Sequence, residues 1–227
     1  MNQGRTLIVA PHPDDEVLGC GGTIAKLSGK GEEVHVLIVT KGDELFDQDL
    51  IKRGREEAIK AHRLLGVKKT HFADLPAIKL DTLPQYQINE KLLEYFTEIR
   101  PDILFLPFPG DINRDHQIVH ACGMVAARPH NRKIKSIYSY ETLSATNWNS
   151  PVAASPFVPN MFVDISDTIN KKIEAMNTYS SQLGKYPHPR SAETIIALSR
   201  YRGGFVHLHH AEAFVCVRDL KLEAEDF

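Results

Sequence analysis

Short apolar runs alternate along this chain with longer segments whose apolar residues recur every three or four positions. The short runs, rich in β-branched residues, predict buried strands, whereas the longer spacing predicts amphipathic helices. Strands are expected at residues 6–10, 33–40, 70–74, 102–108, 135–141, 157–165 and 213–218. Helices are expected at residues 21–29, 49–65, 89–99, 114–127, 166–183 and 191–201. Strands separated by helices predict an α/β, Rossmann-like fold, a mainly parallel sheet with helices on both faces.

The same pattern bears on the division of the chain into domains. It contains no internal repeat, no low-complexity stretch and no clear linker, so we expect residues 1–227 to form a single domain. An alternative is that residues 144–227 form a cap or small subdomain over the strand ends.

Composition narrows the class of protein without identifying it. Lys and Arg number 27 and Asp and Glu 29, a formal net charge of −2, which gives no reason to expect a nucleic acid or an acidic membrane as partner. No apolar run approaches the length of a membrane span, and we expect no signal peptide. The three cysteines lack metal-type spacing, and their odd number suggests reduced thiols and a cytoplasmic protein. The composition leaves open whether the protein forms a homo-oligomer.

The end of the first predicted strand gathers charged and metal-binding side chains. His12, Asp14, Asp15 and Glu16 lie there among two prolines, where open parallel sheets bind their ligands. Carboxylates so close together resist joint ionisation, and a divalent cation held by His12 and one carboxylate removes that cost. The second carboxylate then stays available to take a proton from water. A solvated acidic turn that caps the next helix is the alternative, and it is commoner for acidic turns in general.

The end of the fourth predicted strand supplies a matching histidine. Zinc that activates water needs about three protein ligands and an open position. His12, Asp15 and His116 would supply those ligands. His120 shares a helical face with His116 and is an alternative ligand, although a structural histidine is the commoner interpretation. Two imidazoles in the set favour zinc over magnesium.

Several motifs resemble those of the LmbE-like (PIG-L) deacetylases. The first is Ala-Pro-His-Pro-Asp-Asp-Glu at residues 10–16, followed by Leu-Gly-Cys-Gly-Gly-Thr at residues 18–23. The second is Asn-Arg-Asp-His at residues 113–116, and weaker matches lie at residues 55–58 and 211–214. The resemblance spans nearly the whole chain. It implies a zinc-dependent hydrolase that removes acetate from the N-acetyl group of an amino-sugar conjugate.

The resemblance also implies roles for single residues. His12, Asp15 and His116 correspond to the zinc ligands, and Asp14 corresponds to the general base. Arg55 resembles the arginine that lies near the acetyl pocket in the family. A solvated helix arginine paired with a nearby glutamate is the alternative for Arg55.

One position departs from the family pattern. The family commonly has an oxyanion-stabilising histidine where this chain has Asn113. An asparagine amide can donate a hydrogen bond to an oxyanion, but it can neither carry charge nor deliver a proton. We therefore expect Asp14 or a C-terminal histidine, with His210 the first choice, to protonate the leaving amine. The segment at residues 185–191 resembles a loop seen in some sugar-deacetylating members, in which Arg190 would meet a substrate phosphate; a rigid connector is the alternative for this loop.

Two other functions fit parts of the sequence. A dinucleotide-binding module would use the Gly-Cys-Gly-Gly run at residues 19–22, but the third glycine of that fingerprint is missing. The three acidic residues at 14–16 would also repel a pyrophosphate. A catalytically silent sugar- or nucleotide-binding protein of the same fold is the other alternative. The presence of Asp14 argues against it, because a binding protein needs no general base.

Overall fold

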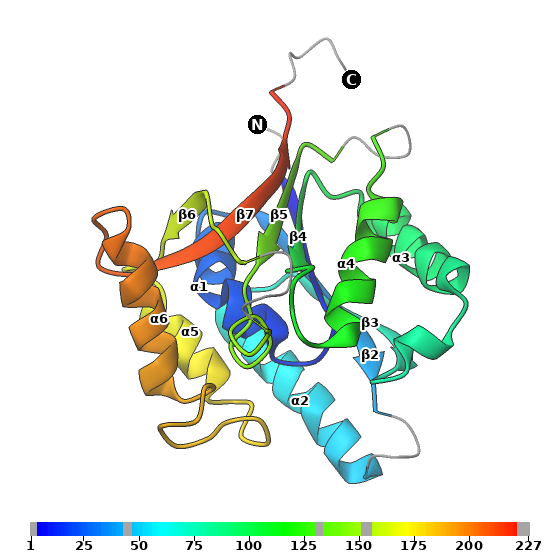
Figure 1. Cartoon of the computed structure of the whole chain (residues 1–227). Helices are drawn as coiled ribbons and strands as arrows, with labels where there is room; N and C mark the ends of the chain where they lie inside the picture. The colour runs from blue at the N-terminus through cyan, green and yellow to red at the C-terminus, as the bar shows by residue number, and fades with distance from the viewer. Residues whose placement is uncertain (1–3, 43–46, 130–133, 151–155, 222–227) are drawn as a thin grey trace.

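A seven-stranded sheet runs through the middle of the protein (Figure 1). The computed structural model describes residues 4–42, 47–129, 134–150 and 156–221. The strands are β1 (Arg5–Ala10), β2 (Glu33–Lys41), β3 (Lys69–Pro76), β4 (Ile103–Pro107), β5 (Ser136–Tyr140), β6 (Met161–Asp164) and β7 (Ala211–Asp219). Their order is β3-β2-β1-β4-β5-β7-β6. The pairs among β1 to β5 are parallel, and β7 is antiparallel to both of its neighbours.

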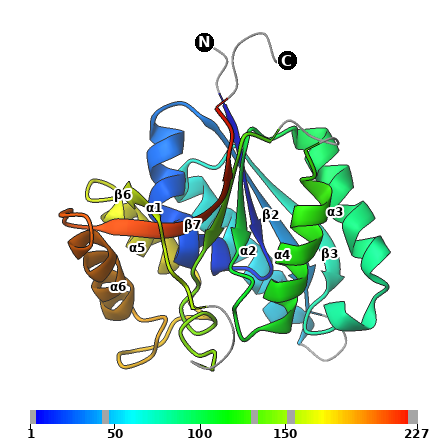
Figure 2. The ribbon, with the colours of Figure 1, turned by 45° about the horizontal axis from the view of Figure 1, so that its top comes forward.

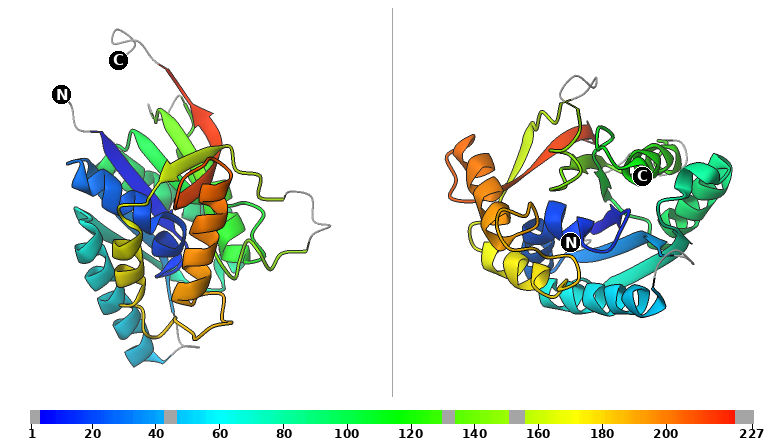
Figure 3. Two further views of the ribbon diagram at one scale, coloured as in Figure 1. Left: turned by 90° about the vertical axis from the view of Figure 1, so that its left-hand side faces the viewer. Right: turned by 60° about the horizontal axis from the view of Figure 1, so that its bottom comes forward.

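Helices cover both faces of this sheet (Figures 2 and 3). They are α1 (Asp15–Gly29), α2 (Gln48–Leu65), α3 (Gln85–Ile99), α4 (Arg114–Ala126), α5 (Ile169–Met176) and α6 (Ala192–Gly204), with a 3-10 turn η1 (Leu80–Thr82). One apolar core joins α1, α2 and α5 to strand residues such as Ile8, and a second joins α3 and α4 to residues such as Leu7. The α/β fold predicted from the sequence is confirmed. No helix in the described ranges has both the length and the apolar character needed to cross a membrane.

The order of the strands creates a switch point between β1 and β4. The chain leaves β1 through α1 on one face, whereas it reaches β4 through α3 on the other face. Loops that follow two such strands diverge to opposite faces and leave a crevice at their carboxyl ends. The two histidine motifs, which follow β1 and β4, therefore meet at this crevice.

The first helix begins at Asp15 and not at residue 21, where the apolar spacing places its start. Asp15 and Glu16 occupy the first turn, where carboxylates interact favourably with the helix dipole. The glycines that follow lie inside the helix and permit close packing. A Cβ at Gly22 would lie 2.7 Å from Ile165. This run is buried in helix packing, so it does not form the exposed phosphate-binding loop of the dinucleotide alternative.

The C-terminal part of the chain extends the sheet and also reaches the crevice. β6 and β7 add two strands beside β5. A helix was expected over residues 166–183, but α5 is shorter and spans only Ile169–Met176. The irregular segment 177–191 that follows brings Tyr179 and Arg190 to the cavity described below.

Two buried histidines join β2 to β3. Nδ1 of His35 lies 3.0 Å from Nε2 of His71, and Nε2 of His35 lies 2.9 Å from Oε1 of Glu33. A hydrogen bond between two imidazole rings needs one unprotonated nitrogen. Burial, together with the positive charges of Lys69 and His35, lowers the pKa of His71 to about 4. His71 therefore stays neutral in the folded protein at pH values where the unfolded chain would protonate it.

We expect the free energy of unfolding to fall as the pH drops from about 6.5 toward 4, because only the unfolded chain then binds a proton at this residue. The loss from His71 is roughly 1–3 kcal/mol, and His71→Asn should remove most of it. Urea unfolding at neutral pH and at about pH 4.5 measures the difference, with the exposed His209→Asn as control. An equal loss in His71→Asn and the wild type would contradict this assignment.

Candidate functional site

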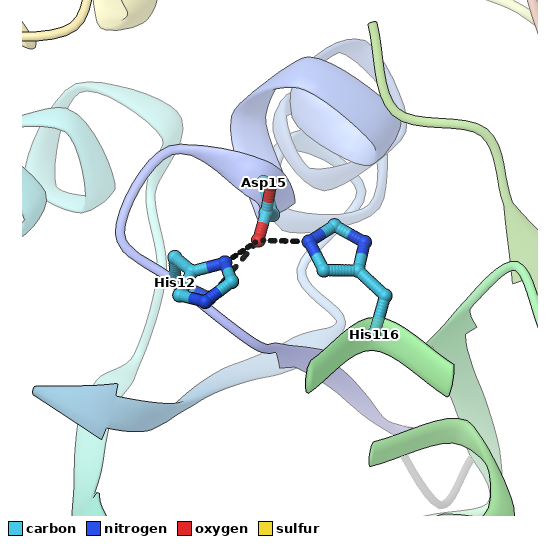
Figure 4. A group of neighbouring side chains, drawn as sticks. All are labelled: His12, Asp15 and His116. Atoms are coloured by element: carbon cyan, nitrogen blue, oxygen red, sulfur yellow. Dashed lines mark hydrogen bonds and ion pairs between the residues drawn. The ribbon is translucent and has the colours of Figure 1, made fainter. Parts of the chain in front are cut away.

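His12, Asp15 and His116 converge where β1 and β4 end (Figure 4). Nδ1 of His12 and Nε2 of His116 each lie 3.2 Å from Oδ2 of Asp15. One ligand atom from each residue lies within 4.8 Å of the other two. Two imidazole nitrogens and a carboxylate oxygen at this spacing form the kind of group that holds a zinc ion. The structure thus brings together the three ligands predicted from the sequence.

Asp15 carries a buried oxygen without a partner. Its Oδ2 accepts the N–H of His12 at 2.9 Å and also contacts both histidine rings. Its Oδ1 is buried and has no hydrogen-bond partner among the described residues. An unsatisfied buried carboxylate oxygen is costly, and a bound cation would remove that cost. This orphaned oxygen, beside two imidazoles, shows that the three residues fit a metal ion.

Two further carboxylates hold the outer sides of the histidine rings. Oδ2 of Asp115 lies 3.0 Å from Nε2 of His12, and Oδ2 of Asp111 lies 2.7 Å from Nδ1 of His116. Carboxylates in this position fix the orientation of metal-binding imidazoles and raise their basicity. Neither aspartate was assigned a role from the sequence. The sequence signal for a role was their position close to His116, in the preceding loop and at the start of the helix.

These carboxylates set the charge of the histidines. Burial alone would lower the pKa of His116, but Asp15 and Asp111 outweigh burial and raise the pKa to about 10. The pKa of His12 is also raised, because hydrogen bonds to Asp115 and Asp15 exceed the effect of burial. Burial opposes ionisation of Asp15, yet the two histidines hold its pKa well below the usual range. A cation bound here would therefore replace protons on the rings.

Asp14 lies beside the group in an unusual backbone conformation. It is only 1% exposed, and its φ of 106° falls in the left-handed region. Nη1 of Arg190 donates a hydrogen bond of 2.6 Å to Oδ2 of Asp14. Burial raises the pKa of Asp14 well above its usual value; Arg190 opposes this rise, and the neighbouring Asp15 and Glu16 add to it. Asp14 is thus a buried carboxylate with a high proton affinity.

Glu16 anchors the turn that carries Asp14. Its Oε1 accepts a hydrogen bond from the hydroxyl of Tyr179 and lies 3.0 Å from Nε2 of His62. Its Oε2 accepts the backbone N–H of Asp14 at 3.2 Å. The sequence indicated only that Glu16 belongs to an acidic cluster. The structure shows that it holds a strained backbone in place from the buried side.

We call the three candidate metal ligands, His12, Asp15 and His116, the metal group; of these, His12 lines a cavity of about 370 Å³. Asn113, Arg55 and Arg190 line this cavity together with His12 and Asp14. Oδ1 of Asn113 accepts the N–H of Asp115 at 2.9 Å and caps α4, so the amide NH2 group stays available to a ligand. The guanidinium of Arg55 lies 4.0 Å above the Phe72 ring, and its Nη1 lies 2.5 Å from Oδ1 of Asp74.

Two histidines considered from the sequence lie outside the cavity. Nδ1 of His210 lies 2.8 Å from Oγ of Ser199, and neither residue lines the cavity. The reason is the strand order, because β7, which follows His210, is separated from β4 by β5. The structure therefore does not place His210 where it could protonate a leaving amine. His120 also stays outside the metal group, since its Nδ1 bonds the carbonyl of Pro107 at 2.9 Å.

Comparisons with known proteins bear on this site. A family model described as PIG-L, GlcNAc-PI de-N-acetylase, matches residues 7–127. The diacetylchitobiose deacetylase of Thermococcus kodakarensis is 29% identical over 190 residues, covering 78% of this chain and 70% of that protein.

Two solved structures show how widely the fold is shared. The structure of N,N'-diacetylchitobiose deacetylase from Pyrococcus horikoshii matches with a TM-score of 0.76 at 23% identity, covering 100% of this chain and 88% of that one. The structure of GalB, a 4-carboxy-2-hydroxymuconate hydratase from Pseudomonas putida, matches with a TM-score of 0.76 at 19% identity, covering 97% and 98%. Proteins named for different reactions share this fold, so function has to be argued from the site.

We expect Asp14→Gly to stabilise the metal-free protein by about 1 kcal/mol, because glycine relieves the left-handed strain and removes a buried carboxylate. Urea unfolding of metal-free wild type and variant measures this change. Arg100→Gly is the matched control, since Arg100 is exposed at the end of α3 with φ of 54° and should gain only from backbone relief. A large loss of stability in Asp14→Gly alone would show that the turn depends on the carboxylate.

Proposed function

We infer the function of this protein from the family to which it belongs: the chain is a member of the PIG-L (GlcNAc-PI de-N-acetylase) family. We propose that it is a zinc-dependent hydrolase that removes acetate from the N-acetyl group of an amino-sugar conjugate. Relatives named as deacetylases of diacetylchitobiose and 2'-N-acetylparomamine support this substrate class. The observation that carries the proposal is the buried carboxylate of Asp14 next to a two-histidine, one-aspartate group.

His12, Asp15 and His116 would hold the metal ion. Two imidazoles and one carboxylate are the donor set of many catalytic zinc sites, and hard cations such as magnesium prefer oxygen ligands throughout. Zinc bound there would supply Lewis-acid chemistry, polarising the acetyl carbonyl and favouring loss of a proton from water. Asp111 and Asp115 would keep the two rings in place.

Asp14 is the residue to which we assign proton transfer. Its Oδ2 is engaged by Arg190, so Oδ1 is the oxygen assigned to take the proton from the attacking water. The bond to Arg190 restrains the carboxylate, and burial strengthens it as a base. Whether Arg190 also meets a substrate phosphate stays a prediction from the sequence.

The amide of Asn113 is the proposed donor to the oxyanion that forms when the acetyl carbon is attacked. Its carbonyl oxygen is occupied by the helix cap, which leaves the NH2 group for this contact. Because His210 lies outside the cavity, we assign protonation of the leaving amine to Asp14, which already holds the proton from water. Arg55 would bind substrate at the wall of the same cavity.

Acetate release from a panel of N-acetylglucosaminyl conjugates tests this function. We expect zinc-loaded wild type to release acetate and Asp14→Asn to lose roughly 10²–10⁴-fold in rate, the scale for a lost general base. Asp81→Asn is the control, because Asp81 is an exposed aspartate of η1 outside the cavity. Near-normal turnover by Asp14→Asn would contradict the role of that residue. Binding of the conjugates without acetate release by wild type would favour the silent sugar-binding alternative.

A further inference from the structure

Part of the cavity lining is aliphatic, and two of its large side chains are exposed. Leu50 is 54% exposed and Ile78 is 58% exposed, and both line the cavity. Ile51 and Gly54 continue the same lining. We call these four residues, Leu50, Ile51, Gly54 and Ile78, the apolar wall. Large aliphatic side chains exposed together in a concave site are typical of a surface that a ligand covers.

Gly54 is the second observation that points to a ligand. It lies inside α2, where glycine weakens a helix relative to alanine. Packing does not explain it, because a Cβ built at Gly54 would have nothing within 4 Å. Gly22, by contrast, is packed against Ile165 and has no room for a side chain. A helical glycine that faces open space in the cavity keeps that space available.

Ile78 is the third observation. Its φ of 56° lies in the left-handed region, which is unfavourable for a β-branched residue. The backbone N–H of Ile78 donates a hydrogen bond of 2.7 Å to Oδ2 of Asp115, the same oxygen that contacts His12. The site thus holds Ile78 in a strained conformation that exposes its side chain at the cavity. Strain of this kind is concentrated where function requires it.

Other residues that line the cavity indicate which part of a ligand would contact which residues. Ser181, Gln182 and Arg190 provide polar groups that suit sugar hydroxyls. The aromatic face of Phe72 is covered by the guanidinium of Arg55 at 4.0 Å, so it is not open for stacking on a sugar ring. The apolar wall therefore suits an apolar part of the substrate, separate from the hydroxyl-bearing ring.

We propose that the apolar wall binds the aglycone, and that the preferred substrates are amino-sugar glycosides with an alkyl or aryl aglycone. This inference rests on the proposed function, in which the acetamido group lies near His12 and Asn113. Leu50, Ile51 and Gly54 come from α2, whereas the metal group and Asn113 come from the ends of β1 and β4. With the acetamido group near His12 and Asn113 and the sugar hydroxyls at the polar groups of segment 177–191, the aglycone is the part of the glycoside left to contact the apolar wall.

Ligand-detected NMR titrations that measure the binding of phenyl β-D-glucoside and methyl β-D-glucoside test the inference without requiring turnover. We expect wild type to bind the phenyl glycoside roughly 10-fold more tightly, from burial of the ring against aliphatic side chains. Leu50→Ser should reduce that preference to about 3-fold or less. Leu64→Ser is the matched control, an exposed leucine on α2 outside the cavity, and it should keep the full preference.

A second variant tests the space beside Gly54. Gly54→Leu should fill the cavity next to the apolar wall and abolish the phenyl preference, while circular dichroism confirms that α2 is retained. Equal binding of the two glycosides by wild type, or a full phenyl preference in both Leu50→Ser and Gly54→Leu, would overturn the inference.

Acetate release from phenyl and methyl N-acetyl-β-D-glucosaminide separates this inference from the proposed function. A kcat/KM for the phenyl compound roughly 10-fold above that for the methyl compound supports both. Release at equal kcat/KM, with equal binding, overturns the aglycone preference alone. Selective binding without any acetate release supports the apolar wall as a binding site and contradicts the deacetylase function.

Discussion

One oxygen atom, Oδ2 of Asp15, links the two halves of the candidate site. It accepts the N–H of His12 and lies 3.2 Å from a ring nitrogen of both His12 and His116, so it joins the end of β1 to the start of α4. Its position is fixed by the first turn of α1 and by the parallel pairing of β1 with β4. Two further carboxylates lie on the outer side of the histidine rings that contact Asp15. Asp111 and Asp115 hold the far sides of the two rings.

Two residues of the candidate site have strained backbone conformations. Asp14 and Ile78 both have positive φ, and both are held there by carboxylates through their backbone N–H groups. One oxygen of Asp115, Oδ2, contacts both His12 and the N–H of Ile78. The residue that orients a metal ligand therefore also positions part of the apolar wall. Metal binding and the choice of aglycone would then depend on one side chain.

The sequence predicted well those parts of the site that are close together in the chain or lie at strand ends. His12 and Asp15 share one motif, and the carboxyl ends of parallel strands meet at one edge of a sheet. The contact between Asp14 and Arg190 spans 176 residues and depends on the irregular segment 177–191, over which a helix was wrongly extended. The position of His210 outside the cavity could not be predicted, because nearness to a motif in sequence does not reveal which strand β7 pairs with.

Reconstitution of metal-free protein with zinc tests most directly whether His12, Asp15 and His116 hold the ion that deacetylation requires. Bound zinc and acetate release would be measured together as zinc is added to wild type, His116→Ala and His120→Ala. We expect both signals in wild type to reach their maximum at about one equivalent, with both lost in His116→Ala. His120→Ala, one helical turn further along α4, should behave as wild type. Full activity of metal-free wild type, or stoichiometric zinc binding by active His116→Ala, would contradict the assignment.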